Sequence, residues 1–207
     1  RSVELAMAKG VRLVVRSTFE DPLAGNAPGS QWGQTGTLVC DEDEIMEQQI
    51  VSGVTLAKAE AKITLRKVKD SPGVAAAIFG TLADKGIIVD MIVQNIADDG
   101  ATTDITFTVP DSEYDKAVKA LEDNGGRFEY ARLSGSKGGA KVSVVGVGMR
   151  SHAGVASSMF KALADKGINI QLITTSEIKT SVLIDEEYAE LAVRALHTYY
   201  GLDKAEG

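Results

Sequence analysis

The chain has 207 residues and a formal net charge of −7, with 44% hydrophobic, 25% charged and only 5% aromatic residues. This composition is typical of a globular protein with one large or two small domains. The acidic balance argues against a nucleic-acid partner, and no apolar run reaches the ~18 residues that a membrane span needs. The single cysteine, Cys40, excludes an internal disulfide, so we expect a small structural residue in a reducing cytoplasm.

The front of the chain, residues 1–45, has the pattern of the end of a domain whose body is absent. A helix is predicted over 2–9 and strands over 11–16 and 37–40, which are too few elements for a core of their own. The glycine-rich stretch 25–36 lacks the Gly-Lys-Ser/Thr ending of a phosphate-binding loop and is interpreted as a connector. Because the chain starts without Met on a helical pattern already under way, we expect a piece of a longer protein.

An internal repeat organises the rest of the chain. Residues 70–92 and 151–173 are identical at eleven of 23 aligned positions. Hydrophobic periodicity predicts, for the first copy, strand 61–68, helix 72–85, strands 88–95 and 103–109, helix 112–123 and strand 127–133. For the second copy it predicts strand 140–148, helix 154–166, strands 168–175 and 179–185, and helix 186–199. Each copy follows the β-α-β-β-α-β order of a ferredoxin-like unit, and glycines within 135–139 are interpreted as the linker between copies.

The second copy lacks its last strand, which would leave an open sheet edge. The apolar segment 49–56 precedes the first copy and is predicted to fill this gap; closure of the edge by a second chain is the alternative. The predicted fold class is therefore α+β, with two ferredoxin-like domains, the first inserted in the second. The predicted domains are 1–45 (domain remnant), 46–59 (strand completing the second copy), 60–135 (first copy) and 140–207 (second copy).

Specific motifs connect this repeat to a known family. An Asp-x-Pro-Gly turn begins at Asp70, and an Ile-x-Val-Asp-Met-Ile-Val-Gln-Asn strand follows at 87–95. Together with segments 102–107, 147–154 and 173–177, these motifs resemble the tandem ACT domains in the regulatory region of the aspartate kinase family. Residues 1–40 resemble the end of that family's amino-acid-kinase catalytic domain, whose ATP-binding motifs would lie upstream.

The resemblance implies a regulatory function. Aspartate kinases phosphorylate the β-carboxylate of aspartate on the route to lysine, threonine and methionine, and end-product lysine, threonine or both inhibit them through the ACT domains. It also implies a homodimer through the ACT domains and a kinase catalytic domain or subunit as partner. ATP and Mg²⁺ would belong to the kinase half, so this chain alone is expected to be inactive and to have no cofactor. Met46 lies where an internal start for a separate regulatory subunit would fall.

An amino-acid ligand needs donors for its carboxylate and acceptors for its ammonium group. The start of the first repeat helix offers backbone N–H groups and a partial positive charge, while Asp70 and Asp90 offer carboxylates. Strand alternation predicts that Asp90 shares a face with Gln94, and Met91 with Asn95. The candidate effector-binding residues are Asp70, Ser71, Pro72, Gly73, Val74, Ala75, Val89, Asp90, Gln94, Asn95, His152, Gly154, Thr175, Ser176 and Glu177.

The two copies predict unequal sites. Ser151 and Gln171 replace the two aspartates in the second copy, so the first copy is interpreted as the main site and the second as a docking surface that completes it. A lysine side chain would need a carboxylate partner, for which Asp90 and Glu177 are the candidates.

Structural interpretations of the same residues remain open. Asp70 with Ser71 can cap the helix, Gly73 is expected to be a packing residue, and Asp90 can be a solvated charge at a strand end. His152 can be structural or contact a ligand carboxylate. No His/Cys/Asp spacing typical of a metal site is present.

Two other classes of protein remain open on the sequence. An ACT subunit of another biosynthetic enzyme, such as acetolactate synthase or threonine deaminase, would share the fold. An RNA-recognition motif shares the element order, but it needs paired aromatic residues on its central strands, where only Phe107 is available.

Overall fold

The computed structural model describes residues 2–11, 13–16, 37–39, 51–97, 100–146 and 154–203. The chain divides into two compact units, Arg1–Gln48 and Gln49–Gly207. In the first unit, helix α1 (Ser2–Ala8) is followed by two short antiparallel strands, β1 (Leu13–Val15) and β2 (Thr37–Val39). These elements fall where the sequence predicts them. Cys40, Met46 and the glycine-rich stretch 25–36 lie outside the described residues.

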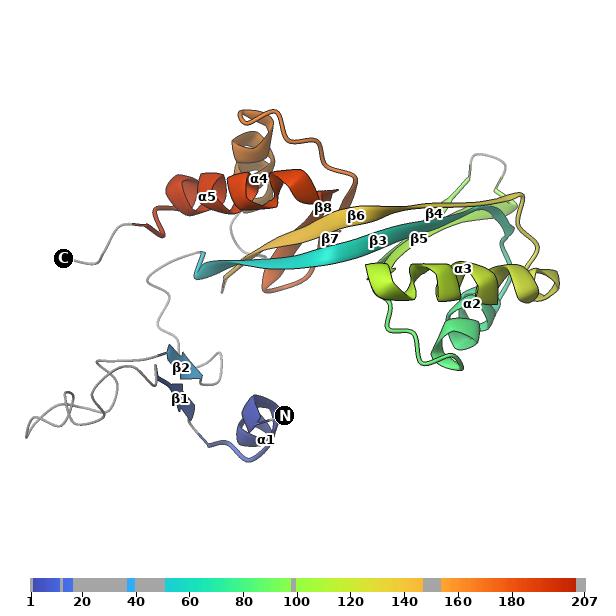
Figure 1. Ribbon diagram of the computed structural model, residues 1–207, viewed down its shortest axis with the longest axis horizontal. Helices are drawn as coiled ribbons and strands as arrows, with labels where there is room; N and C mark the ends of the chain where they lie inside the picture. Colours follow the sequence, from blue (N-terminus) through green and yellow to red (C-terminus); the bar gives the residue numbers. More distant parts are fainter. Residues whose placement is uncertain are drawn as a thin grey trace, which may run out of the picture. The chain divides into compact units, whose positions relative to one another are not determined.

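The second unit is built on one antiparallel sheet of six strands in the order β4-β5-β3-β6-β8-β7. Two long central strands, β3 and β6, run through both sequence repeats (Figure 1). The strands are β3 (Gly53–Lys69), β4 (Asp90–Ile96), β5 (Thr102–Pro110), β6 (Arg132–Val145), β7 (Leu172–Thr175) and β8 (Lys179–Asp185).

Strand β3 serves the two repeats with different halves. Residues 53–57 pair with 141–145 of β6 in the second repeat, whereas residues 60–69 pair with β5 in the first. The strand order is β6-β3-β5-β4 in the first repeat and β3-β6-β8-β7 in the second, which is the same topology twice. The segment before the first repeat therefore supplies the last strand of the second, and the first ferredoxin-like domain is inserted in the second. The exact domain boundaries stay a prediction, because β3 and β6 run through two of them.

Strand β6 runs without a break through the glycines that were expected to form a linker, so that expectation is wrong. The reason is a close approach between β6 and the neighbouring β3. A Cβ atom on Gly135 would lie 2.7 Å from the Lys62 carbonyl oxygen and from the Tyr114 ring, and one on Gly139 would lie 2.8 Å from the Glu60 carbonyl oxygen. Glycine is needed here so that one backbone can approach another, not to make the chain flexible.

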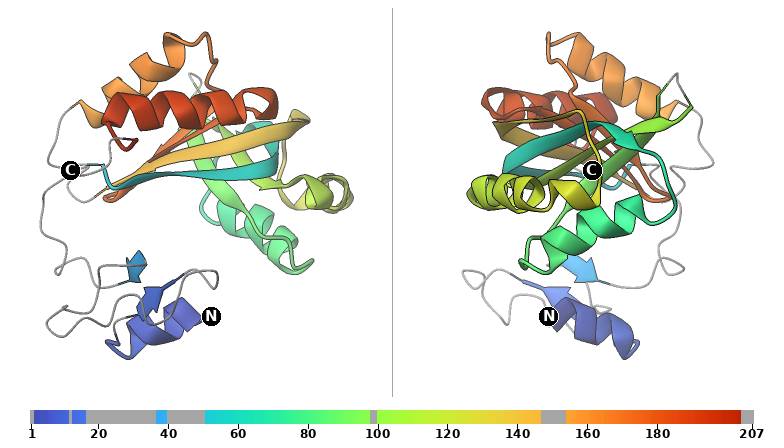
Figure 2. Two further views of the ribbon diagram at one scale, coloured as in Figure 1. Left: turned by 60° about the vertical axis from the view of Figure 1, so that its left-hand side comes forward. Right: turned by 90° about the vertical axis from the view of Figure 1, so that its right-hand side faces the viewer.

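Two helices cover one face of each repeat. The two pairs lie on opposite sides of the shared strands (Figures 1 and 2). They are α2 (Val74–Ala83) and α3 (Tyr114–Asp123) in the first repeat, and α4 (Val155–Ala164) and α5 (Ala189–Tyr200) in the second, with 3₁₀ turns η2 (Asp111–Glu113), η3 (Gly125–Arg127) and η4 (Glu186–Tyr188). Because apolar residues recur at helical spacing, the inner face of each helix is buried, as at Val74, Ile78 and Leu82 of α2.

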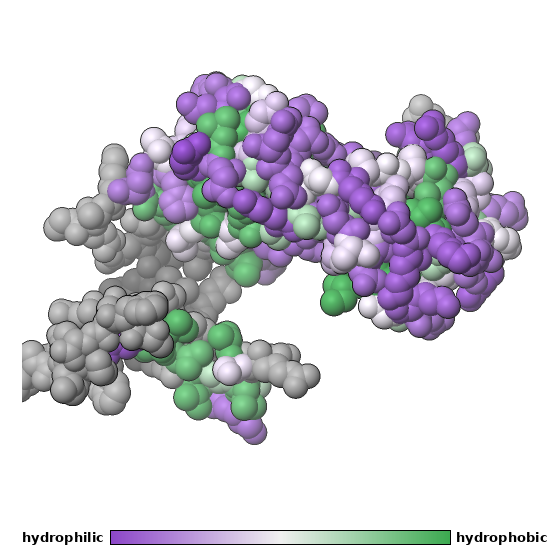
Figure 3. All heavy atoms as spheres, viewed as in Figure 1, coloured by the Kyte–Doolittle hydropathy of each residue, from purple (hydrophilic) through white to green (hydrophobic). Residues whose placement is uncertain are grey.

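Each repeat has its own core. One cluster joins β3, β5, α2 and α3, with Phe107 and Phe79 in edge-to-face contact at 5.4 Å between ring centroids. The other joins β6, β8, α4 and α5 around Val142, Met159 and Leu196. Hydrophilic side chains predominate on the face of the second unit seen in Figure 3. The insertion therefore links two separately packed domains through shared strands.

Tyr200 connects the end of α5 to the start of α4. Its ionisation should make the free energy of unfolding decrease at alkaline pH. Its hydroxyl donates to the Val155 carbonyl oxygen at 2.8 Å, and burial, with Tyr199 nearby, raises its pKa from 10.0 to about 12. Between these pH values the unfolded state loses a proton that the folded state keeps, so the free energy of unfolding should fall as pH rises. Thermal unfolding from pH 9 upward, for the wild type and Tyr200→Phe, measures this slope. An equal slope in Tyr200→Phe would contradict the assignment.

Candidate functional site

The turn that opens α2 is exposed and begins the candidate site. Gly73 is the N-cap residue with φ 94°, and no side chain caps the helix, so the capping expected from Ser71 and Asp70 is not observed. A Cβ atom on Gly73 would meet nothing within 4 Å, so its backbone conformation, and not packing, requires glycine. The Val74 N–H donates to the Ser71 carbonyl oxygen at 3.1 Å, so the donors that remain at the positive end of the helix dipole begin at half-buried Ala75. With exposed Pro72 before them, they can bind a carboxylate.

Asp70 lies at the entrance to this turn. Its N–H donates to the Ala101 carbonyl oxygen at 2.9 Å, which fixes the backbone at the end of β3. The side chain is exposed, and none of the hydrogen bonds or ion pairs found in the described part of the chain uses its carboxylate. Asp70 is thus placed to accept an ammonium or hydroxyl group from a ligand at the start of α2.

Strand β4 does not alternate as predicted. On β5, Asp90 lies opposite Thr108 and Asn95 lies opposite Asp104. Gln94 lies opposite Ile105, which is on the other face of β5. Directly opposite residues share a face of the sheet, so Asp90 shares its face with Asn95 and not with Gln94. The cause is a register shift directly after Asp90, where Met91 adopts a left-handed φ of 46°.

The first-repeat candidates fall into two groups at opposite ends of β4. Asn95 lies at the end of the sheet from which β3 leads to the α2 turn, whereas Val89 and Asp90 lie at the other end, beside the part of β5 that pairs with Lys62. Asp90 and Asn95 lie opposite Thr108 and Asp104, which are four positions apart on β5, and this corresponds to about 14 Å along the strand. One chain therefore does not bring the α2 turn and Asp90 into a single site. Val89 itself packs against the first core.

Asp90 belongs to the contact between the two repeats. Its carboxylate forms an ion pair with the Lys141 ammonium group of β6 and accepts the Met91 N–H at 2.8 Å. Burial pushes the pKa of this carboxyl upward, but the Lys141 and Met91 bonds outweigh burial and the pKa is lowered. Asp90 is a half-exposed, ion-paired carboxylate and not merely a solvated charge at a strand end.

Lys141 and its counterpart Lys62 were not among the candidates predicted from the sequence. The two lysines occupy equivalent positions in Ala61-Lys62-Ile63 and Ala140-Lys141-Val142, and Lys62 Nζ donates to Gln171 Oε1 at 2.9 Å. A lysine between two apolar strand residues, repeated in both copies, was the available signal. Its partner could not be named because the partner lies in the other repeat.

The second-repeat candidates lie at the corresponding end of β7. Gly154 opens α4 with φ 118° and without a side-chain cap, as Gly73 opens α2. Thr175 ends β7, and Glu177 is exposed in the turn that follows. Ser176 is held in this hairpin, because its N–H donates to the Lys179 carbonyl oxygen at 2.8 Å and its hydroxyl accepts the Lys179 N–H at 3.2 Å. The second repeat thus repeats the open helix start but offers no aspartate beside it.

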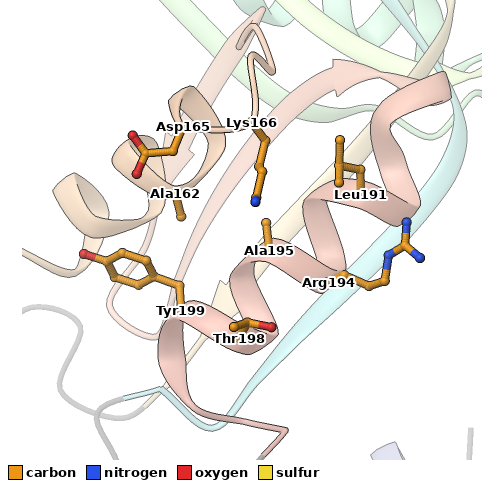
Figure 4. Close-up of a pocket in the computed structure, with 8 residues that line it drawn as sticks. All are labelled: Ala162, Asp165, Lys166, Leu191, Arg194, Ala195, Thr198 and Tyr199. Carbon is orange, nitrogen blue, oxygen red and sulfur yellow. The ribbon is translucent and has the colours of Figure 1, made fainter.

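A surface pocket of about 370 Å³ lies elsewhere, between α4 and α5 (Figure 4). Asp165, Lys166 and Arg194 are among its lining residues, and none of the predicted candidates is. Asp165 is paired with Lys161, so the pocket has no carboxylate reserved for a ligand. The candidate His152 lies outside the described residues.

Within the described residues, no group of three or more His, Cys, Asp or Glu side chains could hold a metal ion. No helix in the same part of the chain is long and apolar enough to cross a membrane.

Comparisons with known proteins identify the fold. The family model of the ACT domain matches residues 66–124 and 142–200, one segment in each repeat. The sheet order, the helix pairs and these two matches define the chain as a protein with tandem ACT domains.

The relatives narrow this class to one family. The chain is 51% identical to aspartate kinase of Pseudomonas putida over 98% of its own length and 46% of that protein. It shares 49% identity with a chain in the structure of aspartokinase alpha and beta subunits, over 73% of this chain and 99% of that one, with a TM-score of 0.67. It shares 40% identity with the regulatory subunit of aspartate kinase from Thermus thermophilus, over 73% of this chain and 99% of that one, with a TM-score of 0.67.

The chain belongs to the aspartokinase family and corresponds to its regulatory region. It spans about half the length of the curated relatives that it matches. The resemblance noted in the sequence is thereby confirmed.

Proposed function

We propose that this region senses an end-product amino acid, lysine and/or threonine, and inhibits the aspartate kinase reaction by feedback. The observation that carries the proposal is the exposed, uncapped start of α2, with the Asp70 carboxylate beside it. The N–H groups at the start of α2 can donate to the carboxylate of an α-amino acid, and Asp70 can accept its ammonium group. By this proposal ATP and Mg²⁺ act in the kinase catalytic domain or subunit, and the region works in the cytoplasm with no cofactor of its own.

A second copy of the chain completes the site in this proposal. Strand β4 is an edge strand, and Ile88, Ile92 and Ile96 are 76%, 51% and 68% exposed. Symmetric pairing of β4 with β4 of a second copy must be antiparallel. It would place the Asp90 end of one copy beside the Asn95 end of the other. The two groups of candidates, which are about 14 Å apart along one strand, would then meet at the seam.

Feedback follows if the ligand prefers one packing of the paired domains over another. A ligand can shift an equilibrium only by its difference in affinity for the two states, typically about 1–3 kcal/mol of coupling. The kinase catalytic domain or subunit would respond to the packing that the ligand favours.

Calorimetric titration with lysine and threonine, separately and together, tests the proposal. Aspartokinase III of Escherichia coli, which shares the fold at 24% identity, has been solved in complex with lysine and aspartate, which supports lysine as one of the two probes. Saturable heat from either one supports a sensor, and mutual enhancement indicates concerted feedback. Silence from both, with a cooperatively folded chain, would contradict the proposal.

Asp70→Ala should weaken ligand binding about 10- to 100-fold, because it removes a charged hydrogen-bond acceptor. The unfolding temperature should change little, because the Asp70 carboxylate takes part in none of the hydrogen bonds or ion pairs found among the described residues. Asp84→Ala, at the opposite end of α2, is the matched control and should bind as the wild type does. Equal affinities for both variants would remove Asp70 from the site.

The alternatives raised by the sequence are not favoured. The relatives are aspartate kinases, not acetolactate synthase or threonine deaminase. An RNA-binding sheet would present aromatic rings on its open face, but Phe107 is fully buried in the first core.

A further inference from the structure

The lysines Lys62 and Lys141 reveal a difference in charge between the two repeats. Both reach from a long shared strand to the start of the edge strand in the other repeat. Their acceptors occupy equivalent positions in the two copies: Asp90 is the first residue of β4, and Gln171 directly precedes β7. The Lys62 ammonium group donates to the neutral amide oxygen of Gln171, whereas Lys141 and Asp90 form an ion pair. Equivalent lysine side chains thus make the contact in both repeats, but only Lys141 neutralises a carboxylate.

The ion pair is well shielded on its cationic side. The Lys141 side chain is 19% exposed, compared with 48% for Asp90. Lys179 also favours the ionised Asp90 carboxylate. Glu60, on β3 beside the pair, is affected by both partners: burial raises its pKa, Lys141 lowers it and Asp90 raises it. The Asp90 carboxylate is therefore already neutralised by Lys141 without a ligand.

We infer that Lys141 is a specificity-determining residue: by occupying Asp90, it makes the first-repeat site select an amino acid with a neutral side chain over one with a cationic side chain. This inference rests on the proposed function. A lysine ligand could use Asp90 only by displacing Lys141, which would leave a mostly covered ammonium group without its partner. Losing the partner of a shielded charge is unfavourable, so the exchange opposes binding of the cationic ligand.

Asp90 would then not bind a lysine side chain, contrary to the expectation from the sequence. In the paired arrangement, the Asp90 end of one copy meets the α2 turn of the other, and it brings Lys141 with it. A ligand such as threonine needs no cationic partner there. Lys141 acts through Asp90, so its effect should appear as a ratio of affinities and not as a uniform loss.

The test compares threonine and lysine as probes by calorimetry on the wild type, Lys141→Met and Lys62→Met. The wild type should prefer threonine, and Lys141→Met should shift the affinity ratio toward lysine by about tenfold, because Asp90 is then free for a cation. Lys62→Met removes the same charge at the equivalent position from a neutral acceptor. Its ratio should stay within about twofold of the wild type.

A further variant separates specificity from folding. Asp90→Asn combined with Lys141→Met removes both charges, and its ratio should return toward that of the wild type. A wild type that prefers lysine, a Lys141→Met ratio that moves no more than that of Lys62→Met, or no return in the double variant would each overturn the inference. If the folded wild type binds neither amino acid, the proposed sensor function fails as well. If threonine binds and only the ratio is unchanged, the sensor stands and the role of Lys141 falls.

Discussion

Replacing Gly135 with alanine is expected to lower the free energy of unfolding by about 3 kcal/mol, the upper end of what forced overpacking causes. The new Cβ atom would lie 2.7 Å from the Lys62 carbonyl oxygen and from the Tyr114 ring. Tyr114 can move aside, but the carbonyl oxygen belongs to the paired backbone of β3 and cannot move without disturbing the ladder. Denaturant unfolding followed by circular dichroism measures the loss.

Gly53→Ala is the matched control for this prediction. Gly53 also lies in a long shared strand, yet a Cβ atom there would meet nothing within 4 Å. Its replacement should be neutral or slightly stabilising, because alanine restricts the unfolded chain. If the Gly135 variant were as stable as the Gly53 variant, the two strands would not approach as closely as described.

The repeat made most of the fold predictable from the sequence. Apolar spacing within 72–85 and 154–166 is local information, and it indicated the first helix of each copy. Counting strands then showed that one was missing, and residues 53–57 supply it. Both inferences needed only periodicity and the rule that a sheet does not leave a long edge unpaired.

The features that the sequence did not reveal depend on contacts between strands that lie far apart in the sequence. The glycines at 135–139 have the composition of a linker, and only the neighbouring β3 explains why they lie in a strand. The register shift at Met91 alters the face of Asp90, and alternation alone cannot show it. Lys141 and Asp90 are 51 residues apart, so their pairing becomes visible only once the two domains share strands.

Only part of the candidate site could be predicted from the sequence. The Asp-x-Pro-Gly motif correctly indicated an exposed helix start, although Gly73 and not Ser71 occupies the N-cap position. Asp90 and Asn95 proved to lie at the two ends of β4, and the strand between them is longer than a free amino-acid ligand. Linear proximity in the sequence could not distinguish one compact site from two half-sites.

If two chains pair through β4 as proposed, Ile92→Lys should separate them and abolish ligand binding. Ile92 is 51% exposed on the β4 edge, and in a symmetric dimer the new ammonium groups would appear twice at one seam. We expect the dimer dissociation constant to rise at least about a hundredfold, or about 3 kcal/mol. Sedimentation velocity over a range of concentrations measures dissociation, and calorimetry with threonine and lysine measures binding.

Ile173→Lys tests the other edge of the same sheet. Ile173 is 43% exposed on β7, so the substitution adds the same charge to an equally accessible edge strand. If β4 forms the seam, Ile173→Lys should remain paired and bind ligand as the wild type does. Dissociation caused by Ile173→Lys alone would move the seam to β7, where no aspartate lies beside the helix start. Loss of pairing in Ile92→Lys with full ligand binding would show that one chain holds a complete site, which the separation of Asp90 from the α2 turn argues against.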